Sequence, residues 1–502
     1  MIRFLACLLL LASCTGTQKL SGDDGKISVN LILINDVYEI APLAGGKEGG
    51  MARLATLKKQ YLNKNPNTYL IMAGDFLSPS VYHTLRHEGQ PIRGRQMIEA
   101  MNVAGVNLAC FGNHEFDINE NELQQRIDES DFQWVASNVF HRVGDSVRAF
   151  RKSDGTILPP FHIMTVKDAD GTTARIGFLG ICLPFNKADY VYYTDALLTS
   201  KDLYQQLHDS VDMIVAITHQ LMEDDIRLAK ELPELAVILG GHEHDQRFEK
   251  IGNVYIAKSM ANAKSSFVIT LNFDTRTQKL NVNPQLHILD EKVPPDSVTN
   301  KAVKKWTSIA DSSFAPLGFH PDSIVLYEGP ALDGRELLIR KQPTNLSQLV
   351  AASMQYVCPN ADLTGFNAGS IRVDDVLHPP LTEYDILRTL PFGGGIREVD
   401  MKGTLLLKVL EQGLKNVGTG GFIVWNDRVE QQNNVWFIRK KPLDTSAIYR
   451  VALSDFLITG KEVNLEFLHP SNPDMIKVYD APATNNPAFD IRKALIAYLK
   501  SK

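Results

Sequence analysis

The sequence predicts an α/β protein with two domains. Of its 502 residues, 44% are hydrophobic and 22% are charged, which is typical of a globular protein too long for a single core. Short apolar runs of strand length alternate with stretches whose apolar residues recur three and four positions apart, as in helices that cover a sheet. A polar helical stretch follows Val293-Pro294-Pro295, and a second α/β pattern follows that stretch.

The first residues predict export from the cytoplasm. Arg3 precedes a short apolar run that is too short to span a bilayer, which is typical of a secretory signal. Leu11-Ala12-Ser13-Cys14 resembles a bacterial lipoprotein cleavage box, after which the cysteine carries lipid. We therefore expect a lipoprotein signal peptide over 1–13, a tether over 14–26, and an extracytoplasmic protein anchored to a bacterial membrane through Cys14, in the periplasm or at the cell surface. The alternative is a plain secretory signal with an incidental cysteine.

The remaining cysteines and the net charge exclude several classes of protein. Cys110, Cys182 and Cys358 are widely spaced, so they predict core residues rather than a disulfide framework or a CxxC metal motif. A formal net charge of −6 provides no basic face for a nucleic acid polymer. An anionic substrate must therefore be held locally, by metal ions or by a few arginines.

The N-terminal domain is expected over residues 27–293. Helices are predicted over Met51–Leu62 and Gln96–Asn102, where the apolar spacing is helical. The candidate strands are Ser28–Ile34, Tyr69–Ala73, Leu108–Phe111, Trp134–Ser137, Ala174–Gly180, Met213–Thr218, Ala236–Leu239 and Tyr255–Lys258.

A helical linker is expected over residues 294–320, with its helix over Ser297–Ser313, and a smaller α/β domain over 321–502. The predicted elements of this second domain are helices Ser347–Tyr356 and Gly403–Leu414 and strands Tyr449–Ala452 and Met475–Val478.

Polar residues follow five of the predicted strands, at the point where each strand ends. They are Asp36, Gly74-Asp75, Gly112-Asn113-His114-Glu115, His219 and Gly240-Gly241-His242-Glu243-His244. Taken singly these motifs are weak, because Gly-Asp is usually a turn and a lone histidine is usually structural. Ligands bind at the carboxyl ends of strands in open α/β sheets, and Asp, Asn and His are ligands of divalent metals. The ordered set therefore predicts a metal-dependent site for the hydrolysis of phosphate esters.

With these motifs the sequence resembles the calcineurin-like metallophosphoesterases, and specifically the secreted 5′-nucleotidase and nucleotide-sugar hydrolase family. The resemblance covers nearly the whole mature chain. It implies a layered β-sandwich flanked by helices in the N-terminal domain, and a C-terminal 5′-nucleotidase domain that binds the nucleotide. It also implies a rotation of the second domain that carries substrate to the metals.

The resemblance implies two divalent metal ions, of zinc, manganese, iron or cobalt. One ion is expected at Asp36, Asp75 and His244, and the other at Asp75, Asn113, His219 and His242. Such ions lower the pKa of a shared water and neutralise charge on the phosphoryl group. His114, oriented by Asp117, is expected to stabilise the phosphoryl group or the leaving oxygen without binding metal.

The first motif departs from the family pattern. The family usually has Asp-x-His, whereas this chain has Asp36-Val37-Tyr38. A neutral phenol, with a pKa of about 10, is a poor metal ligand. Tyr38 is therefore either a ligand or a wall residue of the cleft, and an asymmetric metal pair is expected.

The C-terminal half carries the second part of the resemblance. Asn367-Ala368-Gly369-Ser370-Ile371-Arg372 and Leu390-Pro391-Phe392-Gly393 look like two family elements, and the segments around Phe422 and Phe456 look like those that stack on the nucleobase. The residues expected to bind substrate are Asn367, Arg372, Lys402, Phe422, Phe456 and Glu462. The alternative for Phe422 and Phe456 is that both are core aromatics.

The most favoured function is therefore 5′-nucleotidase activity. Two alternatives stay open from the sequence. One is a catalytically impaired surface lipoprotein that binds nucleotides. The other is the same enzyme class acting on 2′,3′-cyclic phosphodiesters, nucleotide sugars or a sulfur ester.

Overall fold

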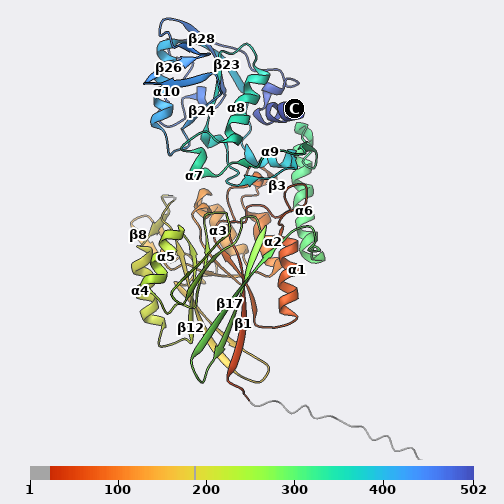
Figure 1. Cartoon of the computed structure of the whole chain (residues 1–502), viewed down its shortest axis with the longest axis vertical. Helices are drawn as coiled ribbons and strands as arrows, with labels where there is room; N and C mark the ends of the chain where they lie inside the picture. Colours follow the sequence, from red (N-terminus) through yellow and green to blue (C-terminus); the bar gives the residue numbers. More distant parts are fainter. Residues whose placement is uncertain (1–22, 186–187) are drawn as a thin grey trace, which may run out of the picture.

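The computed structural model describes residues 23–185 and 188–502. The predicted signal peptide, Cys14 and most of the tether lie outside these residues. The α/β class is confirmed, with a larger N-terminal domain below a smaller C-terminal domain in Figure 1. Within the two described ranges, no helix combines the length and the apolar character that crossing a membrane requires.

The N-terminal domain is built on two six-stranded sheets. The first sheet has the order β17 (Lys279–Ile288), β16 (Ser265–Asp274), β1 (Lys26–Ile34), β2 (Thr68–Ala73), β5 (Leu108–Cys110) and β6 (Gln133–Val135). The second has the order β14 (Arg247–Ile251), β15 (Val254–Lys258), β13 (Val237–Gly241), β12 (Met213–His219), β10 (Thr173–Cys182) and β9 (Phe161–Lys167).

The sheets form a sandwich because both faces of their central strands are apolar. In β1, Val29 and Leu31 pack with Phe178 and Val215 of the second sheet, whereas Ile32 packs against the helical layer. This alternation is the two-residue period of a strand. The near-continuous apolar runs of the parallel strands follow from burial on both faces.

Helices cover the two outer faces of the sandwich (Figure 1). Beside the first sheet lie α1 (Met51–Leu62), α2 (Arg95–Ala104) and α3 (Glu120–Glu129), and beside the second lie α4 (Ala196–Leu207) and α5 (Met222–Glu231). The shorter strands of this domain are β3 (Arg86–His87), β4 (Gln90–Pro91), β7 (Val139–Val143), β8 (Ser146–Arg148) and β11 (Val191–Tyr193). Cys110, Cys182 and Cys358 are buried, as predicted.

The long helix α6 (Ser297–Phe314) coincides with the helix predicted for the linker. It begins where the side chain of Asp296 accepts a hydrogen bond from the Thr299 amide, and it packs against α1 and α2. Trp306 is buried in this contact. In Figure 1, α6 runs along one side of the molecule and leads to the C-terminal domain.

The C-terminal domain has a five-stranded sheet covered by helices on both faces. Its order is β24 (Ile423–Trp425), β20 (Leu363–Asn367), β28 (Ile448–Ser454), β23 (Ile396–Lys402) and β29 (Met475–Val478). The helices are α7 (Glu336–Ile339), α8 (Asn345–Val357), α9 (Glu383–Thr389), α10 (Gly403–Lys415) and α11 (Ile491–Lys500). The short strands are β18 (Ile324–Leu326), β19 (Leu332–Asp333), β21 (Val376–Leu377), β22 (Leu381–Thr382), β25 (Val429–Gln432), β26 (Val435–Ile438) and β27 (Lys441–Pro442).

Candidate metal centre

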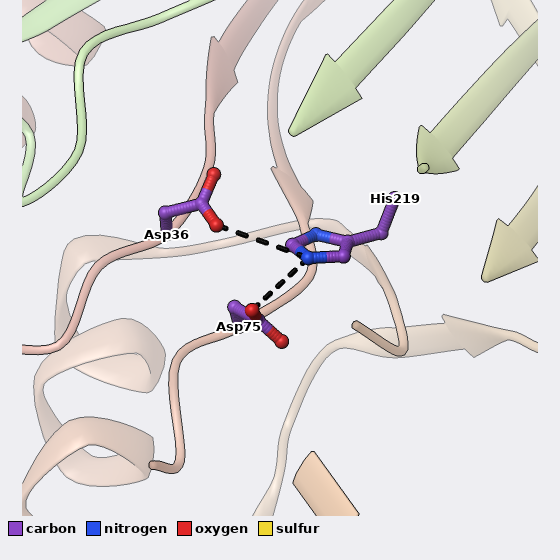
Figure 2. Close-up of side chains that lie close together, drawn as sticks. All are labelled: Asp36, Asp75 and His219. Carbon is purple, nitrogen blue, oxygen red and sulfur yellow. Dashed lines mark ion pairs between the residues drawn. The ribbon is translucent and has the colours of Figure 1, made fainter. Parts of the chain in front are cut away.

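The predicted metal ligands converge where the two sheets of the sandwich meet the C-terminal domain. Asp36, Asp75 and Asn113 follow the parallel strands β1, β2 and β5 of the first sheet. His219 ends β12 and His242 follows β13, which are parallel neighbours in the second sheet. Parallel strands end at the same edge, so these five loops meet in one place. Figure 2 shows Asp36, Asp75 and His219 pointing toward one another.

The backbone at these positions is strained. Asp36 has φ 53°, Asp75 φ 58°, His242 φ 94° and His244 φ 65°. Positive φ is uncommon outside glycine, and such strain is retained chiefly at functional sites. These left-handed residues lie in the turns that follow β1, β2 and β13.

Each of the two central carboxylates has one oxygen fixed by the protein. Asp36 Oδ2 accepts hydrogen bonds from the Asn35 side-chain amide at 2.6 Å and the His242 backbone amide at 2.9 Å. Asp75 Oδ1 accepts from the His114 backbone amide at 2.8 Å. The other oxygens face His219, whose Nε2 lies 3.8 Å from Asp36 Oδ1 and 3.0 Å from Asp75 Oδ2 (Figure 2).

The histidines are held by their Nδ1 atoms. His219 Nδ1 contacts the Ala73 carbonyl oxygen at 2.8 Å, and His244 Nδ1 contacts the carbonyl oxygen of Asp374. When Nδ1 carries the hydrogen, Nε2 has a free lone pair for a metal. His242 lies beside His219, with ring centroids 5.3 Å apart.

Glu115 supports the loops that carry Asp75 and Asn113. Its carboxylate accepts hydrogen bonds from the backbone amides of Asp75, Phe76, Leu77 and Gly112, at 2.6 to 3.0 Å. Burial, together with the charge of Asp75, raises the pKa of Glu115 to about 7. A Cβ on Gly112 would lie 2.2 Å from Asp75 Oδ1, so only glycine lets the two loops approach. Glu115 belongs to the Gly-Asn-His-Glu motif, but the motif alone did not indicate this supporting role.

The pKa values of the site show how strongly its charges interact. Burial lowers the pKa of His219, but the carboxylates of Asp75 and Asp36 outweigh burial and raise that pKa to about 9. Burial lowers the pKa of His242 to about 3, and the neighbouring His219 adds to this effect. For Asp36, the charges of His244 and His219 overcome burial and lower its pKa.

Tyr38 reaches into this cluster. Its hydroxyl lies 2.9 Å from His244 Nε2, 3.2 Å from Asp75 Oδ2 and 3.4 Å from Asp36 Oδ1. Burial raises the pKa of Tyr38 well above its ordinary value, and the charge of Asp75 raises it further. The phenol is therefore neutral and donates its hydrogen within the cluster.

His114 and Asp117 form the predicted pair. His114 Nδ1 lies 2.7 Å from Asp117 Oδ2, within the short 3₁₀ turn His114–Asp117. Ser78 donates a hydrogen bond to the same carboxylate oxygen at 3.1 Å. Burial lowers the pKa of His114, but the charges of Asp117 and Asp75 outweigh burial and raise it to about 10. His114 is therefore a positively charged hydrogen-bond donor in this state.

The C-terminal domain places three charged residues against this site. Arg372 lies 3.4 Å from Asp117 Oδ2, and Glu336 Oε2 lies 3.9 Å from His114 Nε2. Asp374 Oδ2 lies 3.5 Å from His244 Nε2. A cavity of about 300 Å³ opens between the domains here and is lined by residues that include Asn113, His242, Arg335 and Glu336. Of Arg372, Glu336 and Asp374, only Arg372 was predicted from the sequence.

The structure brings together several of the predicted substrate residues. The Asn367 amide donates a hydrogen bond to Glu462 at 2.9 Å. The Ala368 backbone amide donates to the Phe422 carbonyl oxygen at 2.7 Å, so the segments of Asn367 and Phe422 are adjacent. The two predicted rings differ in exposure, because Phe456 is 42% exposed and Phe422 only 6%. Phe422 therefore matches the alternative of a core aromatic, and Phe456 does not.

Lys402 lies apart from this group. In the pairing of β23 with β28, Ile396 is opposite Ser454 and Lys402 is opposite Ile448. The loop of Phe456 follows Ser454, so Lys402 lies at the other end of the strand, roughly 20 Å away. Lys402 pairs there with Asp474 at 2.9 Å. The expectation that Lys402 contacts substrate is not supported by its position in the fold.

The donor set fits divalent metal ions. Two groups of three carboxylate and imidazole donors lie with their ligand atoms within 4.8 Å of one another in the described part of the chain, namely Asp36 with Asp75 and His219, and His114 with Glu336 and Asp374. His219 Nε2 is buried and, among the described residues, makes no hydrogen bond despite its 3.0 Å distance from Asp75. Buried carboxylates and imidazoles in this arrangement are ligands for zinc and related ions.

Comparison with known proteins agrees with this description. Residues 29–246 match the family described as calcineurin-like phosphoesterase, and residues 327–468 match the family described as 5′-nucleotidase, C-terminal domain. The chain is 23% identical to the 5′-nucleotidase of Bos taurus over 469 residues, which cover 82% of this chain and 78% of that protein. It is 22% identical to the trifunctional nucleotide phosphoesterase protein YfkN of Bacillus subtilis, over 86% of this chain and 32% of that one.

A solved structure shares the whole architecture. The crystal structure of a 5′-nucleotidase precursor from Thermus thermophilus matches with a TM-score of 0.64 and 22% identity, covering 95% of this chain and 96% of that chain. The likeness therefore extends over both domains and the helix between them.

Proposed function

We infer that this chain, which belongs to the family that joins a calcineurin-like phosphoesterase domain to a 5′-nucleotidase C-terminal domain, is a metal-dependent hydrolase that releases phosphate from nucleoside 5′-monophosphates. The observation that carries this proposal is the convergence of buried carboxylates and imidazoles directly beneath the C-terminal domain. Metal-dependent phosphoester hydrolysis is the general activity that the two family matches indicate. The nucleotide substrate is the finer proposal.

Two divalent ions are proposed for this site. Asp36, Asp75 and His244 would hold one ion, and the second would be held by Asp75, Asn113, His219 and His242. Bound there, such ions supply Lewis acidity and an activated water for attack on phosphorus. The protein contributes the fixed orientation of the donors, since one oxygen of each carboxylate is already hydrogen bonded.

His114 is proposed to act on the phosphoryl group rather than on a metal. Because Nδ1 faces Asp117 at 2.7 Å, Nε2 is directed toward the cleft between the domains. A charged imidazole in this position donates a hydrogen bond to a phosphoryl oxygen or to the leaving oxygen. Asp117 keeps the imidazole oriented and charged.

The C-terminal domain is proposed to bind the nucleoside. Arg372 reaches the catalytic pair and suits the bidentate recognition of phosphate oxygens. The exposed ring of Phe456 suits stacking on a base, whereas Phe422 is buried. Asn367 and Glu462, which are hydrogen bonded to each other, offer polar groups to the ribose.

The decisive experiment measures inorganic phosphate released from nucleoside monophosphates with added manganese, cobalt, zinc or iron(II). Phosphate release by the wild-type protein and its loss in Asp75→Ala are expected, since Asp75 faces both proposed ion positions. No turnover with any metal, or undiminished turnover in Asp75→Ala, would sink the proposal. Parallel assays with 2′,3′-cyclic phosphodiesters, nucleotide sugars and sulfur esters define the substrate class.

The position of Tyr38 keeps a binding protein as a second candidate, because a neutral phenol stands among the ligands of one ion. This candidate predicts calorimetric binding of a nucleotide without phosphate release. A lipid anchor at Cys14 is proposed separately for the exported protein. Incorporation of labelled fatty acid into the wild-type protein but not into Cys14→Ala would support that anchor, and equal labelling would exclude it.

A further inference from the structure

We propose that Asp374 of the C-terminal domain is a ligand of the ion held by Asp36 and His244, so that this ion bridges the two domains. The inference rests on the metal centre of the proposed function. It adds a donor from outside the phosphoesterase domain, and it gives the metal a role in domain closure.

The distances around His244 support a shared ion. Its Nδ1 faces the carbonyl oxygen of Asp374, which leaves Nε2 for the metal. Nε2 lies 3.2 Å from Asp36 Oδ1 and 3.5 Å from Asp374 Oδ2. Two ligands held at about 2.1 Å from one ion are about 3.0 to 3.4 Å apart at ordinary coordination angles. The Asp36 oxygen is therefore spaced from the imidazole as two ligands of one ion are spaced, and the Asp374 oxygen lies about 0.1 Å beyond that range.

The two oxygens of Asp374 are arranged in the same way as those of the two central carboxylates, Asp36 and Asp75. Its Oδ1 accepts a hydrogen bond from the backbone amide of Glu336 at 2.6 Å, at the start of α7. Its Oδ2 is directed at His244. Asp36 and Asp75 show this division, with one oxygen fixed by an amide and the other facing an imidazole. Asp374 therefore keeps one oxygen directed at an imidazole of the proposed metal centre, as Asp36 and Asp75 do.

The loop around Asp374 is held against the N-terminal domain. Asp374 has φ 38°, and its two neighbouring charged residues, Arg372 and Asp375, bind the N-terminal domain on either side. Arg372 contacts Asp117 at 3.4 Å, and Asp375 contacts Lys264 at 2.7 Å. The loop is thus held across the interface at three points, with Asp374 in the middle.

Tyr38 gives the reason for a further ligand. Its hydroxyl lies 2.9 Å from the same His244 Nε2. A neutral phenol keeps its hydrogen and donates it to a carboxylate, so it is a weak ligand. An anionic oxygen from Asp374 supplies the strong donor that the phenol does not.

A metal that takes ligands from both domains couples its own binding to their closure. The ion binds more tightly when the domains are closed, and closure is more favourable by the same factor when the ion is bound. The ion would therefore stabilise the closed arrangement of the domains in addition to its catalytic role.

The test uses the full chain, stripped of metal and titrated with zinc in a calorimeter without nucleotide. Asp374→Asn keeps Oδ1 as an acceptor for the Glu336 amide and replaces Oδ2 with an NH₂ group, which cannot bind a cation. Asparagine also tolerates positive φ. We expect the wild-type protein to bind two zinc ions, and Asp374→Asn to lose about 10- to 100-fold in affinity for one of them.

Asp375→Asn is the matched control. It removes one charge from the adjacent position. It weakens the contact with Lys264 across the interface and the contact with Arg388 inside the C-terminal domain. Because Asp375 binds Lys264 across the interface, its loss weakens closure and lowers the affinity for the interdomain ion, but by less than the loss of about 10- to 100-fold expected for Asp374→Asn, and the affinity for the other ion should stay at the wild-type value. A pair of fluorophores on α4 and α10 adds a second measurement, because zinc should increase the closed fraction of the wild-type protein and of Asp375→Asn, but not of Asp374→Asn.

Wild-type zinc affinity in Asp374→Asn, or an equal loss in Asp375→Asn, would overturn the inference. Absence of zinc binding by the wild-type protein would overturn it together with the proposed function. Zinc binding that depends on Asp374 without any nucleotide hydrolysis would leave the inference standing and remove the proposed function. The two can therefore fail separately.

Discussion

Replacing Lys258 with methionine is expected to destabilise the N-terminal domain and to weaken its metal site in one step. Lys258, at the end of β15, is 1% exposed, and its ammonium lies 2.8 Å from Asp225 and 2.6 Å from Glu243. It also donates hydrogen bonds to the carbonyl oxygens of Gln220 and Gly241, at 2.6 and 3.0 Å. These carbonyls belong to the chain segments that carry His219 and His242, so the ammonium holds the loops of two proposed metal ligands in contact.

The magnitude follows from the burial of all three charged groups. Burial lowers the pKa of Lys258, but the charges of Asp225 and Glu243 outweigh burial and raise it, so the ammonium stays charged at neutral pH. Removing it leaves two carboxylates, 0% and 4% exposed, without their counterion. Breaking a buried ionic group in this way costs about 3–5 kcal/mol.

The assay is urea unfolding of the metal-free full chain, followed by zinc titration of the folded variant. Lys201→Met is the matched control, because Lys201 and Glu231 form an ion pair in which both side chains are 44% exposed. Its loss should cost less than about 1 kcal/mol. A Lys258→Met protein within about 1 kcal/mol of wild type, with unchanged zinc affinity, would refute the reasoning that this buried charge organises the loops.

Four further results are expected. Asp75→Asn should reduce the rate of phosphate release about 1000-fold, because it removes the carboxylate that faces both proposed ions. His114→Gln should lower kcat about 100-fold while both metals stay bound, as measured by elemental analysis. Phe456→Ala should raise KM roughly tenfold with little change in kcat, because base stacking is worth about 1–3 kcal/mol. Burial lowers the pKa of His83 to about 4, so stability that is present above pH 6.5 is lost as the pH falls toward 4, by about 2 kcal/mol at pH 5. His83→Gln should therefore reduce the pH dependence of the urea unfolding midpoint over this range.

Local patterns were sufficient to predict that the loops carrying the proposed metal ligands converge. Asp36, Asp75 and His219 each follow an apolar run that forms a parallel strand, and parallel strands end at one edge. Their convergence therefore follows from the order of elements along the chain. The helix α6 was predicted for a similar reason, because its spacing is helical and it begins just after a pair of prolines.

Contacts between the domains could not be predicted in this way. Asp374 and Glu336 lie in short loops and a single helical turn, where no periodic signal exists. Their partners, His244 and His114, are more than a hundred residues away. Lys402 shows the converse difficulty, since its position before Gly403 gives no sign that the register of β23 carries it to the other end of the strand from the Phe456 loop.

The charges at the domain interface constrain how substrate enters. Glu336 is the anionic neighbour of His114 and is also bound by Arg340, at 3.0 Å. A nucleotide phosphate has the same sign of charge and would compete with the Glu336 carboxylate for the His114 imidazole. His114 and Arg340 would then exchange one anion for another, and neither would be left buried and unpaired. Asp374 differs from Glu336 in this respect, because its free oxygen lies 3.5 Å from His244, a proposed metal ligand. The interface can therefore release one carboxylate to admit substrate while the other continues to hold the domains together.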